Sequence, residues 1–408
     1  MQTPSGESQT IHRVTEWPGQ EAGKQHSKIP TLAWYDTNGR VHHSLLFASS
    51  VQLTRLIQAM AFGAEAQLDT IQERAEDNSW VLVKHFRLHL NPKDIQANHD
   101  IKIESLPLRI TLQQIYSDFL RYLVQHTRKY MEDRILQGKQ LWQQLSPRMN
   151  VVFTHPNGWG VGEQEFLRSV AVSTRLSNAN QASSRVQFVT ESEALACFYV
   201  HHTNLGNILR PEMNFAICNA GDSTTDTTLY SVTSSHPIIK FEEKRAMTCL
   251  HAGSIFVNFE VEKFLRKTFT IAELDLNVIE EYAKAGTMDF ESFAKLGFKD
   301  PTTDCTIRIA GSLFNNVALR VRRGRMFLPG LTVKGFFEGS LKQITESVDQ
   351  QLKGIKVPYI LLVGSFGNIP YIRNEFMRQY ESRGSQIIHT SYSPSNAIAD
   401  GALVWNMT

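Results

Sequence analysis

Two short glycine-containing segments follow apolar stretches and carry residue types that bind phosphate. The first is Asn219-Ala220-Gly221-Asp222-Ser223-Thr224-Thr225-Asp226, and the second is Gly364-Ser365-Phe366-Gly367. A small turn after a strand places backbone N–H groups where they can cradle a phosphate or a nucleotide. Tight turns with a purely structural role have the same composition, so one such segment is weak evidence for phosphate binding. The evidence is stronger when both segments are considered together with the elements around them.

Those elements alternate between strand, turn and helix. Apolar runs predict strands over 151–154, 186–190, 215–219 and 359–363, with 227–232 as the hairpin partner of the third. Helices are predicted over 163–175, 193–201, 280–285, 291–296 and 371–380, together with a last helix that opens at 397. A further amphipathic helix carries Phe337, Leu341, Ile344, Val348 and Leu352 on one face. The alternation predicts an α/β fold.

The N-terminal third gives further predictions. Residues 28–47 predict a β-hairpin whose turn is Asp36-Thr37-Asn38-Gly39, and residues 80–90 predict one strand by alternation. A helix is predicted over 111–137, with a capping box from Thr111 and Gln114 and a stop at Gly138. Residues 306–333 predict a mostly β stretch. The basic run 320–325 within it could mark a nuclear signal or a nucleic-acid patch, but its alternation with Val321 favours a solvated strand and turn.

Composition narrows the classes of protein. The chain has 408 residues, 42% of them hydrophobic, and a formal net charge of +2 from 42 basic and 40 acidic residues. These values exclude wholesale disorder and argue against a protein devoted to gripping nucleic acid. The length predicts at least two lobes. The polar N-terminus, the absence of a long apolar run and four scattered cysteines without a CxxC pair predict a cytoplasmic or nuclear protein with free thiols.

Read in order, these motifs resemble the actin-like ATPase superfamily. Within it the closest resemblance is to the nucleotide-binding domain of the seventy-kilodalton heat-shock chaperones, in the divergent group common in filamentous fungi. The family's second phosphate loop, D-x-G-G-G-T-x-D, is similar to residues 219–226, and its adenosine motif, L-V-G-G-x-x-x-x-P, to residues 362–370. Two hinge motifs match 191–196 and 397–402. Further similarity to the fungal group lies at 17–19, 116–123, 156–159 and 322–325, so the resemblance covers about 11–406.

The resemblance implies a two-lobed actin-like fold, in which duplicated ribonuclease-H-like domains flank a cleft that holds ATP or ADP with Mg²⁺. Lobe I would span 1–208, lobe II 209–393, and a C-terminal helix at 394–408 would return towards lobe I. Glu191 and Asp226 would be catalytic, where the family positions metal-bound or attacking water, and Asp226 would also be the metal ligand. The implied nucleotide-binding residues are Gly221, Ser223, Thr224, Thr225, Gly253, Gly364, Ser365, Gly367 and Asn368.

Several positions depart from the family pattern. We find no D-x-G-T motif of the first phosphate loop, so we expect the N-terminal hairpin to be absent. Asp222 and Ser223 replace glycines of the second loop, Asn219 replaces an aspartate used around the metal, and Ser365 replaces the second glycine of the adenosine motif. A carboxylate ~4 Å from a phosphate charge costs on the order of 4 kcal/mol at an effective dielectric constant of about 20. We therefore expect ATP hydrolysis to be slow or absent.

Three functions remain open at this point. The chain could be a heat-shock-70-like ATP-binding protein with weakened or lost ATPase and no peptide-binding domain. It could instead be a non-enzymatic scaffold that uses the same shape for protein interaction. A third alternative is a fragment or isoform of a longer, active ATPase. Protein partners are expected but not identified by the sequence, and neither a membrane nor a specific nucleic acid is expected.

Overall fold

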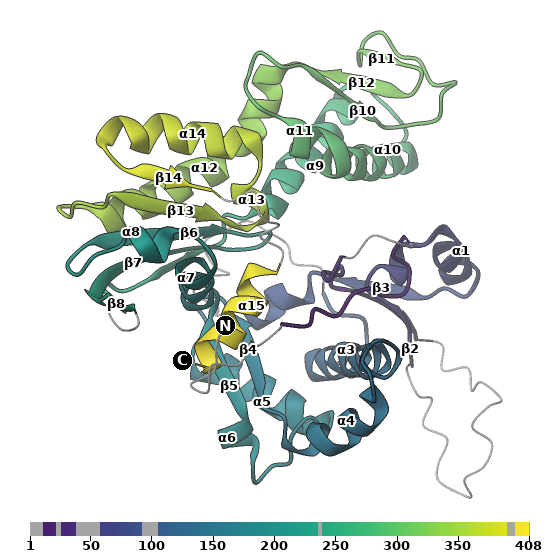
Figure 1. The fold of residues 1–408 in the computed structure, drawn as a ribbon. Coiled ribbons are helices and arrows are strands. Elements are labelled where there is room, and N and C mark those ends of the chain that lie inside the picture. The colour runs from purple at the N-terminus through teal and green to yellow at the C-terminus, as the bar shows by residue number, and fades with distance from the viewer. Residues whose placement is uncertain are drawn as a thin grey trace, which may run out of the picture. The chain divides into compact units, whose positions relative to one another are not determined.

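The computed structural model describes residues 11–21, 26–37, 58–91, 105–235, 239–389 and 396–407. The chain separates into two compact units. The first comprises Met1–Phe153 and Trp159–Val189, and the second comprises Thr154–Gly158 and Thr190–Thr408. Both units mix helices with sheets, which confirms the α/β class (Figure 1). Helix α7 (Glu191–His202) belongs to the second unit, because it packs its apolar residues on the sheet of that unit.

The first unit is built on an antiparallel sheet and a long helix. Strands β1 (Leu32–Asp36), β2 (Gln58–Phe62) and β3 (Val81–Lys84) pair in the order β2-β1-β3. Helix α3 (Leu112–Arg134) closes a core that contains Tyr35, Phe86 and Ile115. The predicted cap is confirmed, since the Thr111 hydroxyl accepts the Gln114 N–H at 3.2 Å. This unit also contains α1 (Asp69–Asp77), α4 (Gly138–Leu145), α5 (Val161–Ser173) and α6 (Ala182–Arg185). Strands β4 (Val151–His155) and β5 (Val186–Thr190) pair with each other and begin in this unit, and their last residues belong to the second.

Two predictions in this unit are wrong, for local reasons. The strand predicted over 80–90 ends at Lys84, because His85 has a left-handed backbone (φ +53°) and Phe86–Leu90 forms a 3-10 helix. Gly138 does not stop a helix but begins α4, and a side chain there would lie 1.8 Å from the Met131 carbonyl oxygen. The return strand of the predicted hairpin lies outside the described residues.

The second unit is organised by a mixed sheet. Strands β6 (Asn214–Ala220), β7 (Thr225–Ser234), β8 (Lys240–Glu243), β13 (Tyr359–Val363) and β14 (Gln386–Ile388) lie in the order β14-β13-β6-β7-β8, and β9 (Thr248–Leu250) also pairs with β7. β6 runs antiparallel to β7 and parallel to β13, which in turn is parallel to β14. The hairpin predicted from 215–219 and 227–232 is thereby confirmed.

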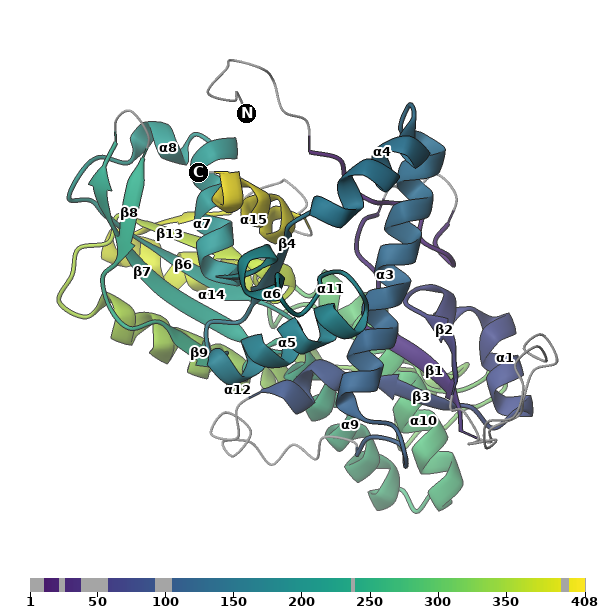
Figure 2. The same ribbon diagram turned by 90° about the horizontal axis from the view of Figure 1, so that it is seen from below.

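Helices cover both faces of this sheet (Figures 1 and 2). Alternation along β6 sends Ala216 and Cys218 to one face and Phe215 and Ile217 to the other. The first face packs on α9 (Ser254–Ile271), α12 (Gly330–Leu352) and α14 (Pro370–Tyr380), and the second packs on α7, α8 (Leu205–Ile208) and α15 (Ala397–Met407). The result is a three-layer α/β/α unit.

A smaller sheet completes the second unit. β10 (Cys305–Arg308), β11 (Val321–Arg322) and β12 (Arg325–Leu328) pair in the order β10-β12-β11, beside α10 (Leu276–Asp289), a π-helical turn at Phe290–Ala294 and α11 (Lys295–Gly297). The basic run therefore forms a strand and a turn, as predicted. The β stretch predicted to 333 ends at Leu328, because Pro329 precedes the start of α12.

Candidate functional site

The two glycine turns meet at the carboxyl ends of neighbouring parallel strands. β6 and β13 are aligned so that Asn219 lies opposite Val363. β13 ends at Val363, and β6 ends one residue after Asn219, at Ala220. Gly364 has φ +89°, and a Cβ atom there would lie 2.2 Å from the Ala220 carbonyl oxygen. Only glycine permits both the conformation and the approach. The sheet thus presses the second turn against the start of the first, in the region where open α/β sheets bind ligands.

The second turn is a single turn of helix, α13 (Gly364–Gly367). Gly367 is buried against Leu362, whereas Asn368 is exposed just after the turn. The first turn is the four-residue connection 221–224 between β6 and β7, closed by the Gly221 N–H donating to the Thr224 carbonyl at 2.9 Å. Sequence reasoning therefore located both turns correctly, and the structure brings them together.

The amino end of α9 completes this cluster. The N–H groups of Ser254 and Ile255 donate to the carbonyls of Gly221 and Asp222 at 3.1 and 2.9 Å. At Gly253 a Cβ atom would lie 2.3 Å from the Asp222 carbonyl oxygen, so glycine is required for the contact. The first amides of α9 are therefore hydrogen-bonded within the chain and do not point at open space.

The side chain of Asp222 joins all three segments. Its Oδ1 accepts the Ser254 hydroxyl at 3.0 Å and the Ser365 hydroxyl at 2.6 Å. Both Asp222 and Ser365 are exposed, so the contact lies at the surface of the second unit. Asp222 is therefore a hydrogen-bond acceptor that ties the first turn to α9 and to α13.

A buried lysine that sequence reasoning missed lies close to this cluster. Lys295 is only 3% exposed, and its Nζ donates to Asn258 Oδ1 at 3.0 Å and to Glu291 Oε1 at 3.4 Å. Burial lowers the pKa of the Lys295 ammonium, and the carboxylates of Glu291 and Asp222 oppose that shift. No motif marked this residue, because its role depends on the packing of α11 against α9.

The two predicted catalytic carboxylates occupy the same sheet edge. Glu191 is the first residue of α7, after a cap in which the Thr190 hydroxyl accepts the Glu193 N–H at 3.1 Å. Glu191 Oε2 accepts a hydrogen bond from Asn219 Nδ2 at 2.9 Å, and both residues are buried. The asparagine that departs from the family pattern thus supplies a donor to this carboxylate, where an aspartate would repel it.

Asp226 on β7 is paired with Asn219 on the neighbouring strand β6 and with Cys249 on β9. It is fully buried, and its Oδ2 accepts the Asn157 N–H at 3.3 Å. Asn157 also donates from its side chain to Thr228 Oγ1 at 2.8 Å. Burial, with the carboxylate of Asp226 as a second cause, raises the pKa of the Cys249 thiol well above its usual range. Asn157 and Cys249 were not predicted, because only the register of β9 and the turn after β4 bring them here.

The remaining predicted residues fall in this cluster. Thr224 and Thr225 are buried, and the Thr225 hydroxyl donates to the Ala252 carbonyl at 3.2 Å. Ser223 is half-buried in the turn. The hydroxyl of Thr225 and the amides of the turn therefore make hydrogen bonds within the chain.

Within the described residues, no group of three or more His, Cys, Asp or Glu side chains is placed to hold a metal ion. Mg²⁺ commonly uses one or two carboxylates together with substrate phosphates, and Glu191 and Asp226 are the carboxylates available.

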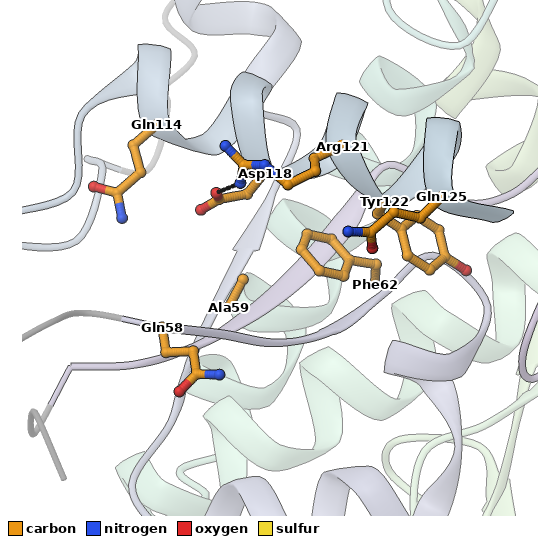
Figure 3. A pocket seen from close by; sticks show the side chains of 8 residues that line it. All are labelled: Gln58, Ala59, Phe62, Gln114, Asp118, Arg121, Tyr122 and Gln125. Carbon is orange, nitrogen blue, oxygen red and sulfur yellow. Dashed lines mark hydrogen bonds and ion pairs between the residues drawn. The ribbon is translucent and has the colours of Figure 1, made fainter. Parts of the chain in front are cut away.

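The first unit has a groove of its own, of about 370 Å³, between β2 and α3 (Figure 3). Arg121 Nη1 donates to Asp118 Oδ1 at 2.7 Å, and the Tyr35 hydroxyl donates to Asp118 Oδ2 at 3.2 Å. The lining residues are Gln58, Ala59, Phe62, Gln114, Asp118, Arg121, Tyr122 and Gln125. None of the predicted catalytic or nucleotide-binding residues lines it, although Asp118, Arg121 and Tyr122 belong to the segment 116–123 that is similar to the fungal group.

Among the helices that the structure describes, none combines the length and the apolar character needed to cross a membrane. No protein-family model matches this sequence, and comparison with curated proteins finds no significant match.

Proposed function

We propose that the chain is a heat-shock-70-like protein of the actin-like fold, with weakened nucleotide binding and without effective ATP hydrolysis. The observation that carries this proposal is the meeting of both glycine turns and the α9 amino end at the carboxyl ends of β6 and β13. The sequence motifs of the family and the geometry of the second unit point to the same place.

The topology of the second unit supports the finer fold. Three consecutive strands, β6, β7 and β8, form an antiparallel meander, and β13 and β14 extend it in parallel on the other side of β6. This is the strand arrangement expected of a ribonuclease-H-like domain, with helices on both faces. In this proposal the two compact units correspond to the two lobes of the actin-like fold.

The contacts around the two glycine turns and the amino end of α9 support weakened nucleotide binding. Any phosphate approaching the first turn meets the Asp222 carboxylate, and the nearest α9 amides already donate to turn carbonyls. If nucleotide binds, Gly364, Ser365 and Asn368 would contact it, and Glu191 and Asp226 would orient water around Mg²⁺. Phosphoryl transfer depends on positioned charge, which the closed cradle supplies poorly.

Calorimetry with Mg·ATP and Mg·ADP tests the proposal. We expect saturable heat only at high micromolar to millimolar nucleotide, and no phosphate release above the protein-free background. Asn368→Tyr should abolish the heat by placing a ring beside α13. The matched control Asn207→Tyr, at an exposed position of α8, should leave the heat unchanged.

The alternative of a non-enzymatic scaffold is favoured by one observation. Asp222 holds the two turns and α9 together through the chain's own hydroxyls, so no ligand is needed to order them. Absence of both heat and thermal shift at several millimolar nucleotide would favour the scaffold. Multiple turnover would contradict both proposals and point to an active ATPase.

A further inference from the structure

Two of the departures from the family motifs contact each other. Asp222, which replaces a glycine of the first turn, accepts a 2.6 Å hydrogen bond from Ser365, which replaces a glycine of the second turn. The two residues are 143 positions apart in the chain, so only the pairing of β6 with β13 brings them together. Two glycines could not make this contact, since neither has a side chain.

We infer that Asp222 and Ser365 form a clasp that determines what the site accepts, by holding a carboxylate where an anionic ligand would have to enter. The inference rests on the proposed function, because it assigns a specificity to the same site. Ser254 supplies the second hydroxyl to the same oxygen, Oδ1, at 3.0 Å, so the carboxylate is held from two sides.

The surroundings explain why a carboxylate is stable in this position. Asp222 lies beside the first turn of α9, an 18-residue helix whose amino end favours negative charge. The buried Lys295 ammonium adds a favourable charge from the neighbouring α11. Asp222 therefore meets the same helix end, hydroxyls and cation that would otherwise attract an external anion. An incoming phosphate must displace an acceptor that is already satisfied.

The clasp differs from simple charge repulsion in what it predicts for Ser365. If Asp222 acted only through its charge, Ser365→Ala would leave nucleotide affinity unchanged, because the charge remains. If the clasp holds the carboxylate in the path of the ligand, Ser365→Ala removes one of the two hydroxyls that hold it, and Asp222, retained by Ser254 on the α9 side, can turn away from the second turn. We then expect the affinity for Mg·ADP to rise about three- to tenfold, and a larger rise for Asp222→Gly with Ser365→Gly.

A double-mutant cycle tests the clasp without any ligand. Asp222→Ala and Ser365→Ala are made singly and together, and the unfolding equilibrium constant is measured by urea denaturation. A hydrogen bond to a charged acceptor predicts that the two effects depart from additivity by about tenfold. The matched control is Ser382→Ala, at an exposed serine that donates to the Gln379 carbonyl, combined with Asp222→Ala. This pair should be additive.

The outcomes separate the two proposals. Additivity of Asp222→Ala and Ser365→Ala within about twofold would overturn the clasp, whatever the nucleotide data show. Coupling without nucleotide binding by any variant would leave the clasp in place and refute the proposed function. Coupling together with unchanged affinity in Ser365→Ala would show that the contact is structural and would overturn its role in specificity.

Discussion

Replacing Gly364 by alanine tests whether the second turn packs as closely against the end of β6 as the structure shows. Gly364 combines a left-handed backbone, φ +89°, with a position where a Cβ atom would lie 2.2 Å from the Ala220 carbonyl oxygen. Gly384 has nearly the same backbone, φ +90°, but nothing within 4 Å of its would-be Cβ atom. Replacing each by alanine therefore separates the cost of the backbone conformation from the cost of the contact.

Two helical glycines supply the other half of the comparison. Gly401 on α15 approaches α7 so closely that a Cβ atom would lie 1.9 Å from the Ala194 carbonyl oxygen. Gly339 on α12 is exposed and has nothing within 4 Å. The four Gly→Ala variants thus cover backbone strain alone, contact alone, both and neither.

The expected magnitudes follow from these features. Gly384→Ala should cost about 1 kcal/mol, since ~1–2 kcal/mol of left-handed strain is partly offset by lower unfolded-state entropy. Gly339→Ala should stabilise by about 1 kcal/mol through helix propensity. Gly401→Ala should cost about 1–3 kcal/mol, because α15 must shift. Gly364→Ala combines strain with contact and should cost about 2–5 kcal/mol.

Urea denaturation followed by circular dichroism measures these changes, with separate transitions fitted if the two units unfold separately. The comparison within the left-handed pair is decisive. If Gly364→Ala costs the same as Gly384→Ala within about 0.5 kcal/mol, the approach of α13 to β6 is not as the structure has it, and the account of the site fails.

Three further predictions concern other groups. Arg245→Met should lower the free energy of unfolding by about 1–2 kcal/mol in urea denaturation, because Arg245 donates to three carbonyls at the carboxyl end of α12. An unchanged free energy would show that these hydrogen bonds are dispensable. Asn219→Asp should cost about 2–4 kcal/mol in urea denaturation at pH 7, because it replaces the donor to Glu191 with a like charge, and an unchanged stability would contradict this reasoning. Burial raises the pKa of the Cys218 thiol to about 12, above its unfolded value, so the stability it contributes is complete below pH 9 and falls as the pH rises towards 12. The stability difference between wild type and Cys218→Ala should therefore shrink by about 2 kcal/mol between pH 8 and pH 10.5, and a constant difference would refute the assignment.

Local sequence patterns predicted most elements of the fold. Short apolar runs marked β4, β5, β6 and β13, and the cap at Thr111 marked the start of α3. The errors arose where the backbone departs from the pattern. His85 adopts a left-handed conformation inside an alternating run, and Gly138 is required by a contact with the preceding helix. Neither cause can be read from spacing alone, because each depends on a neighbouring segment.

The candidate site likewise has features that follow from local sequence and features that depend on distant segments. The sequence by itself determined which two turns carry small and polar residues and which carboxylates accompany them, since these are properties of residue types in order. Only the tertiary structure decided that Asp222 meets Ser365, that Asn219 donates to Glu191 and that Lys295 lies buried nearby. The first contact exists because β6 pairs in parallel with β13 and because glycine lets the connecting turns touch. The second exists because α7 packs on the sheet that contains β6, and the third because α11 packs against α9.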